Sequence, residues 1–454
     1  MSDRRLLIAA PASGNGKTTI TLALMALMTA NGTRVQGFKV GPDYIDPSFH
    51  QLITGRPSYN LDVWMGGEED IRKTFFQHSQ DADISLIEGV MGLLDGVSSN
   101  ANWGSSAHVA HLLNCPVVLV MDIHAMARSA AAIVKGFQAL SGDTAVAGVI
   151  LNRAGSVAHA TMVQSAIEQE TGVPVLGFLL HDASVQLPER HLGLVTAAET
   201  QDQSRPKLEA LGRLLADHLD LDRLWRVAMV DGDVKISKGR QPRVHFKSRP
   251  RVAVAFDRAF NFYYPANLDL LTAMGAELLW FRPTEGEHIP ARATHLYWGG
   301  GFPEEYVHLL AQQTAMMGAM RERIAADGLS TLAECGGYMF LGEALWVNGE
   351  RFPMVGAIPM ETEMTASLQE IGYRELTVLA NSIFPVDSRF RGHAYHHSKI
   401  RRSTGMNPAY AVSSARGSVG LEGYRSQTLL AGYSHLYFPS QPEAVEAWLT
   451  QRMD

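Results

Sequence analysis

The sequence predicts an α/β protein with two domains, each built on its own sheet. The chain has 454 residues, which is too long for one ordinary hydrophobic core, and its hydrophobic content of 46% is ample for two. The first half alternates short apolar runs with helix-like stretches, the pattern of a parallel sheet that helices cover on both faces. A basic stretch then precedes a new series of strand-like runs, which indicates a second α/β domain.

The first half contains six strand-like runs, and helices are expected between them. The runs are residues 6–10, 35–40, 84–87, 116–122, 146–152 and 175–179, and the helices include residues 125–140 and 158–171. Polar residues lie at or beside the ends of several runs, among them Lys39, Glu88, Asp122 and Asn152. Because the ligands of parallel sheets bind at the carboxyl ends of the strands, we expect a site there.

A phosphate-binding loop is predicted between the first strand and the first helix. Residues 11–19 read Pro-Ala-Ser-Gly-Asn-Gly-Lys-Thr-Thr, and small residues here let backbone N–H groups surround phosphates. The following helix adds the partial positive charge of its N-terminus. The strict pattern has glycine where Pro11 stands, and an ordinary glycine turn is the alternative. The predicted ATP-binding residues are Ser13, Gly14, Asn15, Gly16, Lys17 and Thr18.

Carboxylates follow two of the expected strands. Asp43 lies in the rigid loop of residues 41–47, Gly-Pro-Asp-Tyr-Ile-Asp-Pro, and Glu88 follows the run 84–87. Mg²⁺ prefers a few carboxylates together with phosphate oxygens and water. We therefore expect Thr18, Asp43 and Glu88 to hold Mg²⁺. Asp95 stands beside Gly96, where a turn residue and a functional residue are both open interpretations.

A basic segment separates the two halves. Residues 234–251 contain seven Lys or Arg residues and no acidic one. A nucleic-acid patch is the alternative, but the whole chain carries a net charge of −7 and Phe246 is the only interleaved stacking residue. We expect domains at residues 1–230 and 251–454, joined by a linker at 231–250. Strands of the second domain are expected at 252–256, 277–281, 295–298 and 330–333.

The second half carries a candidate nucleophile and a candidate base. Residues 332–338, Leu-Ala-Glu-Cys-Gly-Gly-Tyr, place Cys335 between an apolar run and a glycine pair, as in a nucleophile elbow. His435 follows one hundred residues later. A thiol and a distant histidine form a nucleophile–base pair only if the fold brings them together. A buried structural cysteine is the alternative, and Cys115, in a buried strand, is expected to be inert.

Glycines near these residues could stabilise an oxyanion. Three glycines at 299–301 follow a predicted strand, where their N–H groups could point at a developing negative charge. A plain flexible turn is the alternative. We assign Gly300, Gly301 and Gly336 to this role, which with a thiol and a base makes the set needed for acyl transfer.

Both halves resemble known families. The second half resembles a class I glutamine amidotransferase domain in its Gly-Gly-Gly turn, Cys-Gly-Gly elbow and late histidine. The first half resembles the dethiobiotin-synthetase-like phosphate-loop fold. Together with residues 41–47, 187–194 (Leu-Pro-Glu-Arg-His-Leu-Gly-Leu) and 391–398 (Arg-Gly-His-Ala-Tyr-His-His-Ser), the chain resembles the family of cobyrinic and hydrogenobyrinic acid a,c-diamide synthases over almost its whole length.

The resemblance implies two coupled reactions. Cys335 and His435 would release ammonia from glutamine. The other domain would use Mg²⁺ and ATP to phosphorylate an acetate of a corrinoid acid, first at c and then at a, so that ammonia can displace phosphate. Asn152 would contact the adenine, and Tyr44, Asp46 and Asp95 are assigned to the corrinoid substrate. Many amidotransferases carry a glutamate two residues after the histidine, but Tyr437 stands there, so no third member is assigned.

Other functions remain as alternatives at this point. One is amidation of another tetrapyrrole, such as a nickel-sirohydrochlorin, and another is a phosphate-loop regulator with an inert amidotransferase-like tail. Ala12 stands where partitioning ATPases carry their signature lysine, which disfavours the regulator. The two cysteines favour a cytosolic protein, and we expect no membrane partner because no apolar run reaches membrane-spanning length. The net charge of −7 predicts that the protein binds no nucleic acid. A homodimer is one expected assembly, although the sequence leaves the oligomeric state open.

Overall fold

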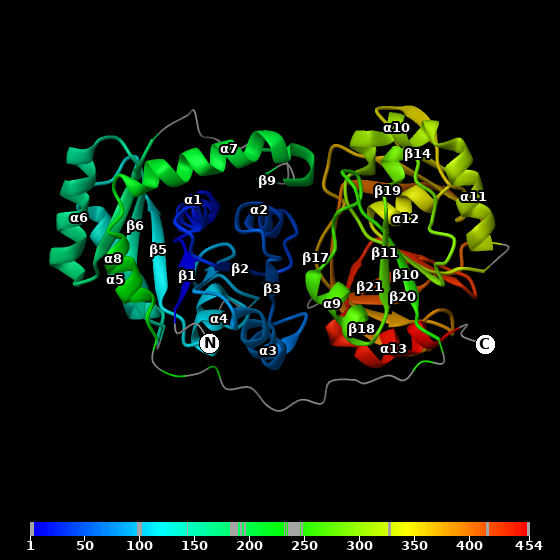
Figure 1. Cartoon of the computed structure of the whole chain (residues 1–454), viewed down its shortest axis with the longest axis horizontal. Helices are drawn as coiled ribbons and strands as arrows, with labels where there is room; N and C mark the ends of the chain where they lie inside the picture. The colour runs from blue at the N-terminus through cyan, green and yellow to red at the C-terminus, as the bar shows by residue number, and fades with distance from the viewer. Residues whose placement is uncertain are drawn as a thin grey trace. The chain divides into compact units, whose positions relative to one another are not determined.

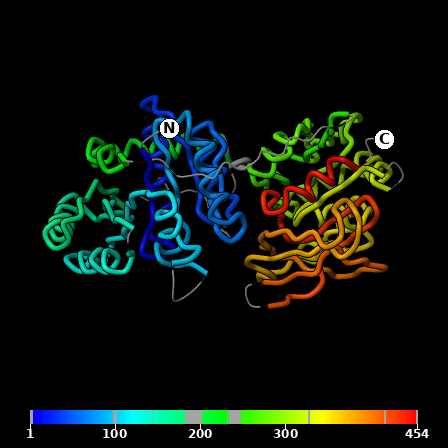
Figure 2. The backbone as a smooth tube through the Cα atoms, turned by 90° about the horizontal axis from the view of Figure 1, so that it is seen from below, coloured from blue at the N-terminus to red at the C-terminus, as the bar shows by residue number. Residues whose placement is uncertain are grey.

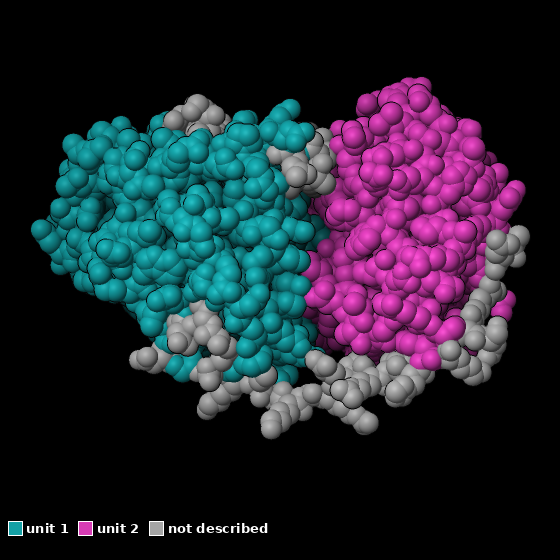
Figure 3. Space-filling view, in the orientation of Figure 1, with its two compact units in different colours: residues 1–238 teal, residues 239–454 magenta. Residues whose placement is uncertain are grey.

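The structure is a computed structural model that describes two compact units. The described residues are 4–97, 102–142, 144–181, 189–190, 193–194, 197–230, 232, 234, 246, 248–325, 328–414 and 417–451. Residues 1–238 form one unit and residues 239–454 the other (Figures 1 and 3). The border between them falls within the predicted linker, most of which lies outside the described residues.

Unit 1 is built on a seven-stranded sheet in which every neighbouring pair is parallel. The strand order is β3-β2-β4-β1-β5-β6-β7. The strands are β1 (Arg5–Ala9), β2 (Val35–Val40), β3 (Tyr59–Leu61), β4 (Ile84–Glu88), β5 (Val117–Asp122), β6 (Val146–Ala154) and β7 (Val175–Leu180). This arrangement confirms the predicted parallel α/β domain.

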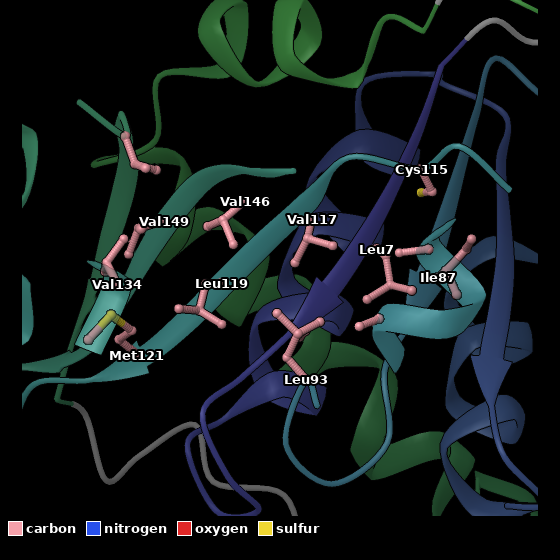
Figure 4. Close-up of a cluster of buried hydrophobic side chains, with 14 of the residues drawn as sticks. Leu7, Ile87, Leu93, Cys115, Val117, Leu119, Met121, Val134, Val146 and Val149 are labelled. Carbon is pink, nitrogen blue, oxygen red and sulfur yellow. The ribbon is translucent and has the colours of Figure 1, made fainter. Parts of the chain in front are cut away.

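The strands of unit 1 are apolar on both faces. In β5, Val117, Leu119 and Met121 join one core cluster, while Val118 and Val120 join the other. Successive side chains of a strand point to opposite faces, so such a continuous apolar run must be covered on both sides. Figure 4 shows part of the first cluster, including the side chain of Cys115.

Helices cover both faces of this sheet. One core cluster includes side chains of α1 (Lys17–Ala30), α2 (Ile45–Thr54), α7 (Ala197–Ala216) and α8 (Leu221–Ala228). The other includes side chains of α3 (Gly67–Ser79), α4 (Ser106–Leu112), α5 (Ser129–Leu140) and α6 (Val157–Thr171). A short antiparallel pair, β8 (Glu189–Arg190) and β9 (Gly193–Leu194), precedes α7.

Unit 2 is centred on a six-stranded sheet of order β11-β10-β12-β13-β23-β22. Its first five strands pair in parallel, and β22 is antiparallel to β23. The strands are β10 (Arg251–Ala255), β11 (Glu277–Phe281), β12 (His295–Trp298), β13 (Ser330–Glu334), β22 (Tyr424–Arg425) and β23 (Leu429–Gly432).

Two further sheets extend unit 2. One has the order β15-β14-β16-β19 and the other, antiparallel throughout, has the order β21-β20-β17-β18-β24. Their strands are β14 (Ala344–Val347), β15 (Glu350–Pro353), β16 (Met360–Met364), β17 (Glu370–Val378), β18 (Arg389–His396), β19 (Ser398–Ser403), β20 (Tyr410–Ser414), β21 (Gly417–Glu422) and β24 (His435–Tyr437).

Helices also pack on both faces of the central sheet of unit 2. One core contains side chains of α10 (Val307–Gln312), α11 (Thr314–Ala325) and α12 (Gly336–Leu341). The other contains side chains of α9 (Pro265–Ala273) and α13 (Pro442–Thr450). Figure 2 shows the C-terminal helix, in red, beside the green start of this unit. In neither unit does a described helix have the length and apolar character needed to cross a membrane.

The predicted strands match observed ones, but the sequence pattern missed part of the architecture. The predicted helix 125–140 begins only at Ser129, because Asp122 accepts a hydrogen bond from the His124 N–H (2.9 Å) in a turn that precedes it. The short strands β3, β8 and β9 and the strands from β14 to β24 were not predicted. Many of these strands are partly exposed and mix polar with apolar residues, so they lack the apolar runs of the central sheets.

Candidate active sites

The phosphate loop of unit 1 joins β1 to α1. Gly14 and Gly16 have φ values of 82° and 92°, in the left-handed region that favours glycine. A Cβ on Gly16 would lie 2.0 Å from Nδ2 of Asn152, so a side chain cannot fit there. The same amide donates a hydrogen bond to the Asn15 carbonyl (3.0 Å). Asn152 therefore braces the loop, and Ser13 and Gly14 are exposed beside it.

Lys17 and Thr18 begin α1 and bind groups from other strands. Lys17 Nζ donates to the Met91 carbonyl (2.6 Å), and burial together with nearby Lys39 lowers its pKa. The Thr18 hydroxyl donates to Glu88 Oε1 (2.6 Å) and lies 3.4 Å from Asp46 Oδ2. The start of the helix is thus linked to two carboxylates.

Lys39 lies in the middle of a buried charged cluster. Its Nζ pairs with Asp46, lies 2.9 Å from Glu88 Oε1 and lies 3.8 Å from Asp43 Oδ2. Burial opposes the charge of Lys39, but the carboxylates raise its pKa above the usual value. His50 Nε2 lies 2.9 Å from Glu88 Oε2. Burial alone would raise the pKa of Glu88, yet Lys39 and His50 hold it below its usual range.

The rigid loop places its two aspartates differently. Asp46, assigned from the sequence to the substrate, contacts both Lys39 and Thr18, and burial beside Glu88 raises its pKa. Asp43 Oδ1 accepts the Ile45 N–H (2.9 Å) at the start of α2. Asp43 is therefore a turn-forming residue as well as a neighbour of Lys39, and Asp46 lies closer to the Thr18 hydroxyl than the sequence suggested. Tyr44, half-buried, directly precedes α2.

Asp95 forms a local turn next to the phosphate loop. Its Oδ2 accepts the Gly92 N–H (2.9 Å), and the space at Gly92 is also bounded by the Pro11 carbonyl. Asp95 thus lies close to the phosphate loop, and its carboxylate accepts a backbone hydrogen bond.

The described side chains of unit 1 could supply only part of the coordination shell of a metal ion. Among the described residues, no group of three or more His, Cys, Asp or Glu side chains could hold a metal ion. Thr18, Asp46 and Glu88 nevertheless bring a hydroxyl and two carboxylates together. These are hard oxygen donors, and Mg²⁺ commonly completes such a set with substrate phosphates and water.

Cys335 of unit 2 stands at a sharp turn between β13 and α12. Its φ of 48° and ψ of −110° are strained for a residue with a side chain, as expected at a nucleophile elbow. Its N–H donates to the Gly432 carbonyl (2.8 Å), which ties the turn to β23. Such strain at a buried thiol favours a functional site over a purely structural cysteine.

The fold brings Cys335 and His435 to the same point, next to Gly300. A Cβ on Gly300 would lie 3.1 Å from Cys335 Cβ, 3.1 Å from His435 Nε2 and 2.4 Å from His435 Cε1. The thiol residue and the Nε2 edge of the imidazole therefore approach one small space, and only glycine leaves it open.

The other two predicted glycines lie beside this space. A Cβ on Gly336 would lie 3.2 Å from the Gly301 nitrogen and 2.9 Å from Pro303 Cδ. Gly301 has a φ of 147°, and a Cβ there would lie 2.2 Å from the Ala259 carbonyl oxygen. The structure thus gathers Gly300, Gly301 and Gly336 around the turn that carries Cys335.

The electrostatic environment keeps both reacting groups neutral. Burial, followed by the influence of Glu304, raises the pKa of the Cys335 thiol to about 12. Burial, followed by His393 and His396, lowers the pKa of His435 to about 3. A neutral imidazole beside a neutral thiol can accept the thiol proton, which is the arrangement of a nucleophile with its general base.

Comparison with known proteins agrees with this division into two sites. Residues 6–195 match the model of the CobQ/CobB/MinD/ParA nucleotide binding domain, and residues 251–443 match that of the CobB/CobQ-like glutamine amidotransferase domain. Cobyrinate a,c-diamide synthase of Priestia megaterium is 44% identical over 457 residues, covering 99% of this chain and 97% of the relative. That of Picrophilus torridus is 39% identical over 450 residues, covering 99% of each.

The chain belongs to the cobyrinate a,c-diamide synthase family. This confirms the resemblance drawn from the sequence motifs in both halves. Both relatives align over 97% or more of their own length, so both halves of this chain have counterparts in them.

Several residues of these sites were not assigned from the sequence. Lys39 and His50 join the charged cluster of unit 1, and Glu334 lies beside His435 in unit 2. Lys39 did give a signal, because it is a cation at the carboxyl end of an expected strand. His50 lies inside a helix and Glu334 inside a strand, where neither spacing nor neighbours distinguish them from structural residues.

Proposed function

We propose that the protein is a glutamine-hydrolysing ligase that uses ATP to amidate the a and c acetate side chains of cobyrinic or hydrogenobyrinic acid. The observation that carries the proposal is the convergence of Cys335, His435 and Gly300 in a chain that also holds a phosphate-binding loop and belongs to this family. An intact nucleophile–base pair argues against an inert amidotransferase-like domain.

In unit 2, glutamine supplies the nitrogen. Cys335 Sγ attacks the side-chain amide carbon while His435 Nε2 takes the thiol proton. His435 then gives that proton to the departing nitrogen, so the C–N bond breaks and ammonia leaves. Water hydrolyses the remaining thioester to glutamate and regenerates the thiol. N–H groups of the glycines around Cys335 would stabilise the negative oxygen of each tetrahedral intermediate.

In unit 1, ATP activates the acetate. The carboxylate oxygen attacks the γ-phosphorus of ATP, giving an acyl phosphate and ADP. Ammonia then attacks the acyl carbon and phosphate leaves, so the acetate becomes an acetamide. Activation is needed because a carboxylate oxygen is a poor leaving group.

The charged residues of unit 1 suit this phosphoryl transfer. Lys17 would stabilise the terminal phosphates. Thr18, Asp46 and Glu88 would hold Mg²⁺, which would offset negative charge on the phosphates. Asp46 takes the place predicted from the sequence for Asp43, because Asp46 contacts Thr18 while Asp43 accepts the Ile45 N–H. Lys39 Nζ lies between Asp46 and Glu88 and offsets part of their negative charge. Tyr44 and Asp46 belong to the loop that we assign to the corrinoid, and Asp43 supports that loop by ordering the start of α2.

A direct assay tests the proposal. The purified protein is incubated with ATP, Mg²⁺, glutamine and either cobyrinic or hydrogenobyrinic acid, and products are read by mass spectrometry. Two successive mass changes that correspond to carboxyl-to-carboxamide conversion, each dependent on ATP and glutamine, are expected with at least one corrinoid. Amidation of nickel-sirohydrochlorin but of neither corrinoid would reassign the substrate, and ATP hydrolysis without glutaminase activity would reject the ligase function.

Two expectations about the whole protein belong to this proposal. A cytosolic location would provide ATP and the reducing conditions that keep Cys335 a thiol. A homodimer stays a prediction, and light scattering on the purified protein measures it.

A further inference from the structure

We propose that Glu334, the residue directly before Cys335, positions the His435 imidazole for proton transfer with the thiol. The inference rests on the proposed glutaminase function of unit 2. The carboxylate near His435 would come from β13, whereas many amidotransferases carry it two residues after the histidine, where Tyr437 stands in β24. Glu334 is a positioning residue, since it acts through His435 and has no direct part in the chemistry at the thiol.

The geometry separates the two nitrogens of His435. Nδ1 lies 3.8 Å from Glu334 Oε2. Nε2 lies on the opposite edge of the ring and approaches the space beside Cys335 and Gly300. A carboxylate near Nδ1 favours the tautomer with its proton on that nitrogen, which leaves the lone pair of Nε2 free to accept the thiol proton. The separation of 3.8 Å is an ion-pair distance rather than a hydrogen bond, and contacts between catalytic groups often tighten only when substrate binds.

Glu334 also holds the backbone that carries His435. Its Oε1 accepts the N–H of Leu436 (3.0 Å), the residue next to the histidine. Its Oε2 accepts the Tyr297 hydroxyl (3.1 Å). Asn267 extends this network, because its Nδ2 donates to the Tyr297 hydroxyl (3.2 Å) and to the Leu436 carbonyl (2.8 Å). The carboxylate is thus fixed at both oxygens and in turn fixes the strand of the catalytic histidine.

The position of Glu334 follows from the strand that ends there. Leu332 and Glu334 alternate with Ala333, so they point to the face of the sheet where Tyr297 and Leu436 are buried. The turn at Cys335 then changes the direction of the chain and brings Cys335 Cβ to Gly300, the same glycine that the Nε2 edge of His435 approaches from the other side. Adjacent residues can therefore contact opposite edges of one histidine ring.

The charges around His435 give the carboxylate an electrostatic role. His393 and His396 of β18 face the imidazole and, with burial, lower the pKa of His435. Glu334 is an acidic side chain within ion-pair distance of His435. Burial raises the pKa of Glu334 to about 8, while the Leu436 N–H and Tyr297 hydroxyl oppose that rise. A positive imidazolium that forms 3.8 Å away would favour the ionised carboxylate, so the two charges stabilise each other as the thiol loses its proton.

Glu334→Gln tests the proposal, with Glu361→Gln as the matched control. Glu361 is also a buried carboxylate of unit 2, and it pairs with Arg351 and Arg402 rather than with a histidine. We expect Glu334→Gln to lower the kcat of glutamine hydrolysis about 10- to 100-fold while changing the KM for glutamine less than about threefold, since orientation of the base is lost and the binding groups remain. Ammonia-dependent amidation should stay at the wild-type rate.

A second measurement reports on the thiol without any substrate. The rate of alkylation of Cys335 by iodoacetamide is followed by peptide mass spectrometry, which separates it from Cys115. The negative charge of Glu334 raises the pKa of the Cys335 thiol, so its removal alone would speed alkylation. Loss of the oriented base that receives the thiol proton should outweigh this effect and slow alkylation about three- to tenfold at pH 8. Glu334→Asp should recover part of the rate, because it restores the charge at a longer distance.

The outcomes distinguish this inference from the proposed function. A glutaminase rate and an alkylation profile of Glu334→Gln that both match Glu361→Gln would reject the positioning role, even in an active ligase. Equal losses of glutamine-dependent and ammonia-dependent amidation in Glu334→Gln would show a structural role and reject it too. Absence of glutaminase activity in the wild-type protein would instead reject the proposed function.

Discussion

Replacement of Gly300 by alanine should disable the glutamine site, because the added methyl group would displace the His435 imidazole. The added Cβ would lie 2.4 Å from His435 Cε1 and 3.1 Å from both His435 Nε2 and Cys335 Cβ. Carbon atoms in contact prefer a separation of about 3.5–4.0 Å, so the imidazole must move by about 1 Å. Gly300 is not among the residues with positive φ, so alanine fits its backbone and the clash is the main effect.

The structure sets the size of the expected loss. A displacement of about 1 Å in a reacting group costs about 100-fold in rate, and overpacking a dense site costs about 1–3 kcal/mol in stability. We therefore expect glutaminase kcat/KM to fall about 100-fold in Gly300→Ala, with a loss of free energy of unfolding in that range. Amidation with ammonium chloride should be retained, because the phosphate loop lies in the other unit.

Gly318→Ala is the matched control for this experiment. Gly318 lies within α11 of the same unit, and a Cβ there would meet nothing within 4 Å. Alanine should leave both activities unchanged and stabilise the helix by about 0.5–1 kcal/mol. Glutamate release is measured by a coupled assay and unfolding by urea titration. A Gly300→Ala glutaminase rate within threefold of that of Gly318→Ala would refute the close approach of Cys335 and His435 at this glycine.

Four further outcomes are expected. Cys335→Ser should abolish glutamine-dependent amidation and keep amidation with free ammonia; equal loss with both donors in a folded variant would contradict two separate sites. Glu88→Gln should reduce ATP-dependent amidation by about 100-fold or more, while Cys335 still reacts with a glutamine affinity label, and full synthetase activity would remove Glu88 from the ATP site. Tyr44→Ala should change the corrinoid KM or the ratio of monoamide to diamide in a chromatographic time course; a large loss of ATP affinity with an unchanged ratio would assign Tyr44 to the nucleotide site. Burial raises the pKa of the Cys335 thiol to about 12. The thiolate fraction, and with it the rate of alkylation by iodoacetamide, should therefore rise about tenfold per pH unit between about pH 6 and 9. A plateau of the rate within that range would contradict the raised pKa.

Asp46 shows why a loop could be recognised from the sequence while the contacts of its members could not. The prolines, glycine and aspartates of residues 41–47 predict a rigid acidic loop because these residue types act locally. Which aspartate reaches Thr18 depends on the direction in which α2 leaves the loop. Asp43 is engaged by the first backbone N–H groups of that helix, and Asp46, one turn further, contacts Thr18 and Lys39.

The sequence by itself determined the alternation of strands and helices, the phosphate loop and the elbow at Cys335, because each depends on the order of neighbouring residues. Apolar period, glycine placement and the charge of Lys17 can all be read within a few positions. The tertiary structure alone decided that His435 meets Cys335 at Gly300 and that Glu334 faces Nδ1 of that histidine. These contacts join residues about a hundred positions apart, and they depend on how β12, β13 and β24 are placed by the packing of whole sheets. A buried glutamate at the end of a strand has no local pattern that distinguishes it, so its partner becomes visible only when the chain is folded.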